Sequence, residues 1–328
     1  MGTQDEDTAG LAVTQATEIT RADIDAARAR LDRRVRRTPV MRVYADQLGP
    51  SHPGFWLKLE SLQVTGAFKA RGALNSLLAA EIPAAGVCAA SGGNHGQAVA
   101  WAARLLGVPA AVFVPTTCPE IKLRRLEEYQ AAVTITGAVY DESLAAAERF
   151  AERTEALLVH PFDQPLTVAG AGTVTAEFIE QVPDLDTILV PVGGGGLLAG
   201  ALAVLSGTQT RAIAVEPFTA RCLGAALATG ERVNVDVSGP AVDSLGPRRV
   251  GLLGFNAARA HNVNHVDVTN AAISRAQRCA WEELRIGLEG GGATALAAIL
   301  DGSYAPARDE AVGVLSCGGN VNIADIVR

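Results

Sequence analysis

Short apolar runs alternate with stretches of helical length along most of the chain from residue 55 onward. The runs are rich in Val, Ile, Leu and Ala, a composition typical of strands buried on both faces of a parallel sheet. Strands that alternate with helices predict βαβ units, and therefore an α/β protein with mostly parallel sheets. We expect strands at 55–60, 86–90, 110–114, 133–136, 156–160, 187–192 and 212–215, and helices within 66–80 and at 95–106, 120–128, 142–152, 173–181 and 197–205.

The N-terminal part of the chain has a different pattern. Residues 1–18 are polar and acidic and are predicted to form a disordered tail. Thr20 and Asp23 have the spacing of a helix N-cap and its N3 partner, which predicts a helix over 21–35. The arginines between Arg28 and Arg37 are interpreted as the solvated face of that helix.

The composition excludes several classes of protein. With 48% hydrophobic and 19% charged residues, the chain carries too much apolar material for a disordered protein. Its 328 residues favour two domains, since a domain commonly spans roughly 100–200 residues. A net charge of −7 argues against a nucleic-acid partner. The apolar segment 188–205 contains four consecutive glycines and Pro191, so we interpret it as strand, loop and helix rather than a membrane span.

Sequence features that report on location point to the cytoplasm. The five cysteines are scattered and form no C-x-x-C pair, which suits thiols kept reduced. The acidic start lacks the hydrophobic run of a signal peptide. Glu6 stands where a myristoylation signal needs Ser or Thr, so Gly2 is not expected to be acylated.

Lysine is rare in this chain, which has three lysines among its 28 basic residues. One of them, Lys69, lies directly after Phe68 in the segment F-K-A-R-G. Arginine cannot lose its proton in a protein, whereas a desolvated lysine amine can, and the neutral amine attacks carbonyl carbons. Lys69 is therefore a candidate nucleophile, and a lysine on a solvated helix turn is the competing interpretation.

Glycine-rich turns follow several predicted strands, at the sheet edge where parallel strands place ligands. The turn S-G-G-N-H at 91–95 opens a helix and suits a carboxylate, although an ordinary turn capped by Asn94, with a structural His95, explains it equally well. Four glycines at 193–196 predict an amide-lined cup suited to a phosphate. A further glycine turn contains Cys317, which on its own is typical of a small buried side chain.

Taken together, these segments resemble the fold type II pyridoxal-phosphate enzymes, specifically the branch of serine/threonine dehydratases and serine racemases. The resemblance runs from about Asp23 to the end of the chain, with the motifs in the family order. It implies a two-domain, tryptophan synthase β-like fold and a homodimer. The large cofactor domain would span 19–85 and 163–328, and the small substrate-gating domain would span 86–162.

The resemblance also implies the cofactor, pyridoxal 5′-phosphate, and a role for each matching residue. Lys69 would bond the cofactor aldehyde and, once released, act as the base, and Phe68 would pack near the ring. Asn94 would bind the ring hydroxyl, Glu289 would lie near the ring, and Cys317 would face the pyridine nitrogen. The phosphate would be held by Gly193, Gly194, Gly195, Gly196 and the amide of Leu197, and the substrate carboxylate by Ser91, Gly92, Gly93, Asn94 and His95.

The chain departs from its relatives at several positions. Racemases of this branch carry a serine where Gly92 stands, so the proton donor on the second face is missing. Relatives bind a divalent metal through the glutamate matching Glu216, a carbonyl near Ala220 and an aspartate where this chain has Cys222. Because a thiol is a poor ligand for calcium or magnesium, we predict no metal. Ser244 replaces a glycine near the substrate, and no isoleucine-binding regulatory domain is expected.

These features predict a pyridoxal-phosphate-dependent ammonia-lyase. The substrate would be L-threonine or L-serine, with a 2-oxo acid and ammonia as products. A neutral thiol at Cys317 would favour loss of the β-substituent over transamination. The alternatives are serine racemase, an eliminase for another amino acid such as 3-hydroxyaspartate or phenylserine, and a cofactor-binding protein without turnover.

Overall fold

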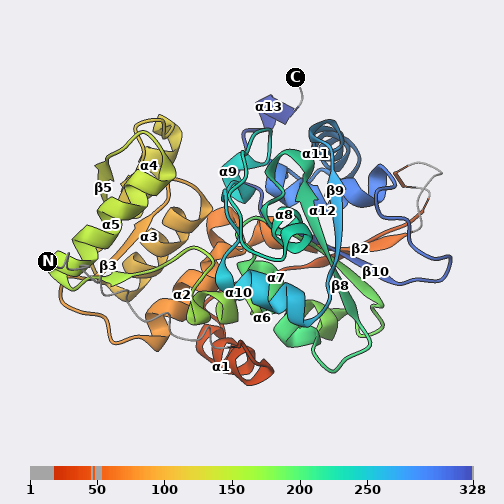
Figure 1. Cartoon of the computed structure of the whole chain (residues 1–328), viewed down its shortest axis with the longest axis horizontal. Helices are drawn as coiled ribbons and strands as arrows, with labels where there is room; N and C mark the ends of the chain where they lie inside the picture. Colours follow the sequence, from red (N-terminus) through yellow and green to blue (C-terminus); the bar gives the residue numbers. More distant parts are fainter. Residues whose placement is uncertain (1–17, 46, 49–53, 327–328) are drawn as a thin grey trace, which may run out of the picture.

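The computed structural model describes residues 18–45, 47–48 and 54–326. Two separate sheets form the centres of two lobes (Figure 1). The larger sheet has the strand order β1-β2-β10-β7-β8-β9, and only the β1–β2 pair is antiparallel. Its strands are β1 (Val40–Val43), β2 (Phe55–Leu59), β7 (Thr187–Pro191), β8 (Arg211–Pro217), β9 (Asn264–Val268) and β10 (Val312–Ser316).

The smaller sheet is entirely parallel and has the order β5-β4-β3-β6. Its strands are β3 (Val87–Ala90), β4 (Ala110–Val114), β5 (Ala132–Ile135) and β6 (Leu157–Leu158). All of them lie within the range 86–162 assigned to the small domain; the domain boundaries themselves stay a prediction. The α/β class with mostly parallel sheets is confirmed.

Helices follow most of the strands. They are α1 (Arg21–Leu31), α2 (Lys69–Ala79), α3 (Asn94–Leu106), α4 (Glu120–Glu128), α5 (Tyr140–Thr154), α6 (Pro165–Gln181), α7 (Gly196–Leu205), α8 (Cys222–Thr229), α9 (Val242–Leu245), α10 (Leu252–Ala260), α11 (Asn270–Leu284), α12 (Gly290–Leu300) and α13 (Ile323–Ile326). No helix in the described part of the chain is long and apolar enough to cross a membrane.

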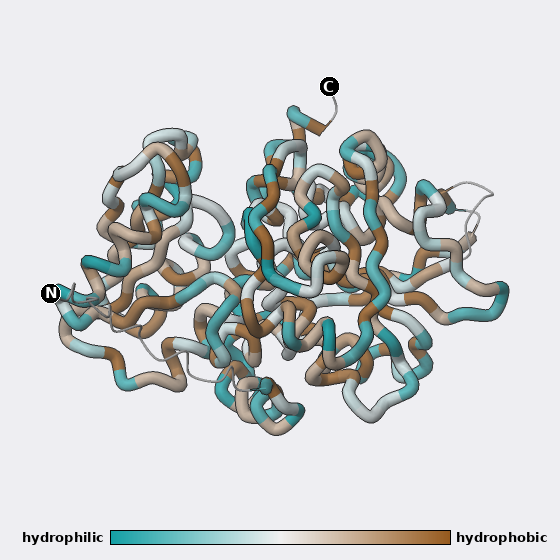
Figure 2. Tube along the Cα trace, viewed as in Figure 1, coloured by the Kyte–Doolittle hydropathy of each residue, from teal (hydrophilic) through white to brown (hydrophobic). Residues whose placement is uncertain are grey.

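Strand β7 shows why a continuous apolar run is needed in a buried parallel strand. Ile188 and Val190 enter a core with residues of α6 and α7, whereas Leu189 enters the core on the other face with α11 and α12. Both faces are covered, so the consecutive residues Ile188, Leu189 and Val190 are all apolar, rather than every second one. In Figure 2 the hydrophobic colour follows much of the buried strands, and many outer loops are hydrophilic.

Most predicted elements are confirmed to within a few residues, and the helix predicted over 173–181 is the largest difference. Helix α6 begins at Pro165, eight residues earlier, in a stretch rich in glycine and β-branched residues. A Cβ on Gly172 would lie 2.8 Å from the carbonyl oxygen of Gly200 in α7. The two helices therefore pack closely at these glycines, and this tertiary packing overrides the weak helix propensity.

The N-terminal predictions are confirmed in part. Thr20 and Asp23 form the expected reciprocal capping box at the start of α1. The helix ends at Leu31 rather than at 35, and Arg33 adopts a left-handed conformation with φ of 57°. The arginines beyond it are therefore not one helix face, and Arg37 pairs with Glu180 of α6 instead. Of the tail predicted over 1–18, only residue 18 lies within the described residues, and Gly2 lies outside them.

A buried network of charges ties β2, α2 and α6 together. Arg71 donates to Glu60 at 2.7 Å and to Glu177 at 3.1 Å, and Lys58 also pairs with Glu177. Thr38 donates its hydroxyl to Glu60 at 2.6 Å. The network contains two cations and two anions, so the buried charges compensate one another. It anchors α2 two residues after Lys69.

Removing one partner of this network should destabilise the protein strongly. In Arg71→Met, Glu60 loses its paired cation inside the core and Glu177 keeps only Lys58, which should lower the free energy of unfolding by about 3–5 kcal/mol. Urea denaturation measures the change. The control is Glu180→Gln, which breaks the solvent-exposed pairs with Arg28 and Arg37 and should cost less than about 1 kcal/mol. Equal effects of the two variants would contradict the assignment.

Candidate active site

The predicted site residues lie where strands of both sheets end and helices begin. Lys69 is the first residue of α2, and its ammonium nitrogen lies 5.1 Å from the ring centroid of Phe68. Asn94 and His95 begin α3 after the turn that follows β3. Glu289 is the N-cap of α12, and Cys317 directly follows β10. These carboxyl ends of parallel strands are the usual position of a ligand site.

One cavity joins Lys69 to the glycine loop. It is narrow, and Phe68, Lys69, Gly196 and Leu197 line it. Pro161 and Phe162, which the sequence analysis did not single out, line it as well. The Lys69 amine donates a hydrogen bond of 2.6 Å to the carbonyl oxygen of Pro161. The predicted nucleophile and the predicted phosphate cup therefore face the same space.

The glycine loop is shaped by close packing. A Cβ on Gly193 would lie 2.8 Å from the Cα of Leu245, and a Cβ on Gly194 would lie 2.3 Å from the Phe162 ring. Gly195, the N-cap of α7, has a φ of 87°, which side chains rarely adopt. The loop thus brings bare backbone to the N-terminus of α7, where the first amides have no partner within the helix.

A chain of amide hydrogen bonds connects the ends of β3 and β10. Asn94 donates to Glu289 at 2.6 Å and accepts from Asn320 at 2.7 Å. Asn320 also donates to the carbonyl oxygen of Thr65. The sequence analysis missed Asn320, although a signal was present: the triplet G-G-N occurs both at 92–94 and at 318–320. The two asparagines of these triplets are the ones that pair.

Burial controls the charges around Lys69. Desolvation lowers the pKa of Lys69 to about 8, against the opposing influence of Cys317 and Glu289. Burial also lowers the pKa of His95 to about 3 and that of His160 to about 4, so both imidazoles are neutral. For Cys317, burial raises the pKa far above its usual range, which keeps the thiol protonated. The two imidazoles and the thiol near the Lys69 amine are therefore all neutral.

Glu289 is the one carboxyl group among the predicted site residues. Its side chain is buried, and burial raises its pKa to about 7, while the hydrogen bond from Asn94 works in the opposite direction. Glu289 therefore changes its charge near neutral pH. A carboxyl group with this pKa can exchange a proton with a neighbouring group at neutral pH.

Some predicted residues have their side chains engaged elsewhere. His95 is 3% exposed, and its Nε2 pairs with the carbonyl oxygen of Val159 at 2.7 Å. Ser91 accepts a hydrogen bond from the amide of Gly93, and Ser244 accepts one from the amide of Gly291 at 3.1 Å. A role for residues 91–95 in carboxylate binding stays a prediction, and backbone amides of the turn are the groups available for it.

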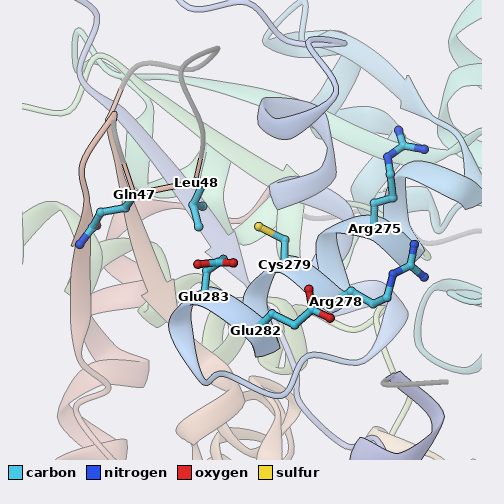
Figure 3. A pocket seen from close by; sticks show the side chains of 7 residues that line it. All are labelled: Gln47, Leu48, Arg275, Arg278, Cys279, Glu282 and Glu283. Carbon is cyan, nitrogen blue, oxygen red and sulfur yellow. The ribbon is translucent and has the colours of Figure 1, made fainter.

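A larger pocket lies on the outer side of α11 and is shown in Figure 3. The lining side chains are charged or polar with few apolar groups, and no glycine turn or strand end contributes to it. The pocket therefore lacks the features of the candidate site. Its lining residues are Gln47, Leu48, Arg275, Arg278, Cys279, Glu282 and Glu283.

The lowered pKa of Lys69 can be measured directly. In cofactor-free protein whose lysines are reductively methylated with ¹³C-formaldehyde, the Lys69 signal should titrate with a midpoint near pH 8, because desolvation disfavours the charged amine. NMR spectra recorded across the pH range give the midpoint, and the signal missing from Lys69→Ala identifies the residue. A midpoint near the ordinary lysine value of 10.5 would show that the amine is solvated.

Comparisons with known proteins agree with this geometry. The L-threonine ammonia-lyase of Geobacter sulfurreducens is 40% identical over 309 residues, which cover 92% of this chain and 76% of that protein. The serine racemase of Dictyostelium discoideum is 34% identical over 94% of this chain and 97% of its own length. The structure of maize serine racemase superimposes with a TM-score of 0.88 at 32% identity, covering 95% of this chain and 96% of that one.

The family model described as pyridoxal-phosphate dependent enzyme matches residues 31–318, which is most of the chain. The matched range includes the catalytic candidate Lys69, the glycine loop and Cys317. The structural neighbours share the arrangement of two mostly parallel sheets flanked by helices. The chain therefore belongs to the pyridoxal-phosphate dependent enzymes of fold type II.

Proposed function

We propose that this enzyme is an ammonia-lyase that removes water from L-threonine or L-serine and releases a 2-oxo acid and ammonia. One observation carries the proposal: Lys69, an amine with a pKa of about 8, opens onto a cavity that also reaches the glycine loop at the start of α7. The 40% identity to an L-threonine ammonia-lyase supports the same reaction.

The residues present fit pyridoxal phosphate. The bare backbone at 193–196 forms a cradle that side chains would fill, and helix N-termini bind phosphate groups. Lys69 would hold the aldehyde covalently, Asn94 would donate to the ring hydroxyl, and the neutral Cys317 thiol would face the ring nitrogen. When bound, the cofactor supplies an electron sink for the charge that develops at the substrate Cα.

The residues around Lys69 suit proton abstraction. With a pKa of about 8, a substantial fraction of the Lys69 amine is neutral near neutral pH and can accept the Cα proton. That proton moves to Lys69, the bond from Cβ to the hydroxyl group breaks, and the departing hydroxide takes up a proton and leaves as water. In the net balance this is the proton that Lys69 received, so the amine is neutral again afterwards. The remaining enamine tautomerises and is hydrolysed in water to the 2-oxo acid and ammonia. Cys317 stays neutral, so no charged partner fixes a proton on the ring nitrogen.

Serine racemase is the second candidate, because racemases are 34% identical over most of the chain. Racemisation needs a proton donor on the face opposite the lysine. At Gly92, where racemases of this branch carry a serine, a Cβ would lie 2.4 Å from the Cys118 sulfur. A side chain therefore has no room unless Cys118 moves. This contact supports elimination as the main reaction.

The proposal includes two further features. We expect a homodimer, which the family resemblance implies, and we expect the enzyme to work in the cytoplasm, which the scattered cysteines and the acidic N-terminal sequence favour. Ser244 contributes a hydroxyl that is bonded to the amide of Gly291, so its influence on substrate choice would be through the position of α12 rather than through a free hydroxyl.

A product assay tests the reaction. Holoenzyme given L-threonine, L-serine, 3-hydroxyaspartate or phenylserine, in both configurations, should form a 2-oxo acid and ammonia in equal amounts from L-threonine or L-serine. Lys69→Ala should lose the visible absorbance of covalently bound cofactor and at least about a thousandfold in turnover, since it lacks both the anchor and the base. Racemised serine with little pyruvate would favour the second candidate.

Asn320 should affect cofactor binding although it lies outside the cavity. Its amide group donates to Asn94 Oδ1, while Asn94 Nδ2 donates one N–H to Glu289 and has a second N–H for the cofactor. In Asn320→Ala the Asn94 amide keeps the bond to Glu289 but loses the one at Oδ1, and the dissociation constant of pyridoxal phosphate should rise by up to about tenfold, the equivalent of one hydrogen bond. Titration of the apoenzyme by absorbance measures it. The control Asn322→Ala removes an exposed asparagine that bonds only locally, to Ala324, and should bind normally.

A further inference from the structure

Glu216, the penultimate residue of β8, anchors the start of α8. The side chain is fully buried. Its Oε1 accepts the amide of Leu223 at 2.9 Å, and its Oε2 accepts the amide of Gly224 at 2.7 Å. These are among the amides of a helix N-terminus that have no partner within the helix. The carboxylate is thus committed to holding α8 in place.

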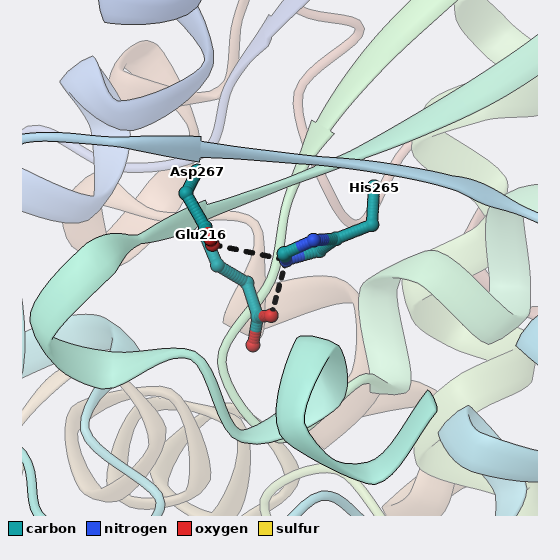
Figure 4. Close-up of side chains that lie close together, drawn as sticks. All are labelled: Glu216, His265 and Asp267. Atoms are coloured by element: carbon teal, nitrogen blue, oxygen red, sulfur yellow. Dashed lines mark hydrogen bonds and ion pairs between the residues drawn. The ribbon is translucent and has the colours of Figure 1, made fainter. Parts of the chain in front are cut away.

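His265 of β9 completes the surroundings of this carboxylate. Its Nε2 lies 2.7 Å from Oε2 of Glu216 and 3.3 Å from Oδ1 of Asp267 (Figure 4). A carboxylate can only accept a hydrogen bond, so Nε2 carries the proton and donates it. The other oxygen of Asp267 pairs with Arg221 at 3.0 Å. The imidazole therefore lies between two carboxylates and donates to Glu216, while Oδ1 of Asp267 accepts no hydrogen bond from a described residue.

The neighbouring residues are adapted to the imidazole. A Cβ on Gly224 would come within 2.5 Å of Cε1 of His265, so the ring fits only against a glycine. Cys222, where relatives carry a metal-binding aspartate, directs its thiol to the carbonyl oxygen of Gly193 at 3.2 Å. A third carboxylate is thus absent from the cluster, and residue 222 is bonded to the glycine loop instead.

The donor set does not fit the calcium or magnesium ion that relatives bind here. These ions need several oxygen ligands, whereas this cluster offers a thiol, an imidazole, a Glu216 carboxylate already bonded to two amides and an Asp267 carboxylate paired with Arg221. We propose that His265 takes the place of that cation, so that α8 and the loop at Gly193 are held without a divalent metal. The imidazole supplies a donor to Glu216 and lies against Asp267, whose other oxygen pairs with Arg221.

A transition metal is the competing occupant. One ligand atom each from Glu216, His265 and Asp267 lies within 4.8 Å of the others, a spacing that a zinc ion could bridge. Zinc would need Nε2 as an unprotonated ligand, and it would displace the hydrogen bond to Glu216. The test therefore includes zinc as well as calcium and magnesium.

The wild-type holoenzyme gives the first part of the test. After treatment with EDTA and removal of the chelator, its melting temperature should be unchanged by millimolar Ca²⁺ or Mg²⁺ or by micromolar Zn²⁺, and calorimetric titration with each ion should show no binding. An ion that binds the native state raises the melting temperature by several degrees when it is present in large excess over its dissociation constant. Such a rise with any of the three ions would overturn the proposal.

Substitution of His265 tests whether the imidazole is the reason. His265→Ala leaves Glu216 without its imidazole donor and removes the ring that lies against Asp267, so the melting temperature should fall and then recover by several degrees on addition of Ca²⁺. His265→Gln keeps an N–H donor and should show a smaller fall and no response to Ca²⁺. The control His261→Ala removes an exposed histidine of the same region and should match the wild type.

Each outcome of the variants decides the question. If wild type, His265→Ala and His265→Gln are all indifferent to Ca²⁺, the imidazole does not stand in for a cation and the proposal is wrong. If His265→Ala cannot be purified, the wild type and His265→Gln still decide the question. A response of either protein to Ca²⁺ would overturn the proposal, and no response in both would support it. Because melting temperature and ion binding need no turnover, the result is independent of which amino acid the enzyme consumes.

Discussion

The buried pairing of Arg71 with Glu60 and Glu177 is the interaction on which the position of Lys69 depends. Arg71 is 2% exposed and lies on the first turn of α2, which begins with Lys69. A guanidinium held by two carboxylates from different elements leaves α2 little freedom to rotate or slide. The amine is thereby fixed relative to the cavity before any ligand arrives, which is what a reacting group needs.

The chemistry of the cavity follows from a second constraint, the shortage of charge around Lys69. His95, His160 and Cys317 are all held neutral by burial. Among the residues that line the described cavity, Lys69 is the one with a basic side chain. A phosphate group bound in this cavity would be stabilised by the backbone amides at the start of α7 rather than by arginine side chains. Lys69 would then be the one cationic side chain of the cavity lining near the phosphate.

The sequence predicted the elements whose patterns are local. The apolar run before Gly193 could only be a buried strand, and the glycines marked the turn to α7. Lys69 and Cys317 were found because residue type and neighbours carried the signal. Helix α6 was predicted too short, since its first half depends on contacts between Gly172 and Gly200 that no local pattern contains.

Features that depend on pairs of residues far apart in the sequence could not be predicted. Asn320 forms a hydrogen bond with Asn94, 226 positions away in the sequence, and the repeated G-G-N triplet was the one sequence signal that linked the two residues. The contact of Glu216 with His265 joins neighbouring strands whose alignment no sequence pattern specified. The prediction that no metal binds here was based on Cys222 alone. The position of His265 beside Glu216 follows only from the pairing of β8 with β9.

The fit of the His265 ring against Gly224 restricts which side chains positions 222 and 224 accept. A Cβ at 224 would lie 2.5 Å from Cε1 of the imidazole, so a larger residue there would displace the ring or the start of α8. An aspartate at 222 would add a buried carboxylate next to Glu216 and would need a cation of its own. Substitutions at 222, 224 and 265 should therefore be non-additive, and a change at one position would be tolerated best together with a change at another.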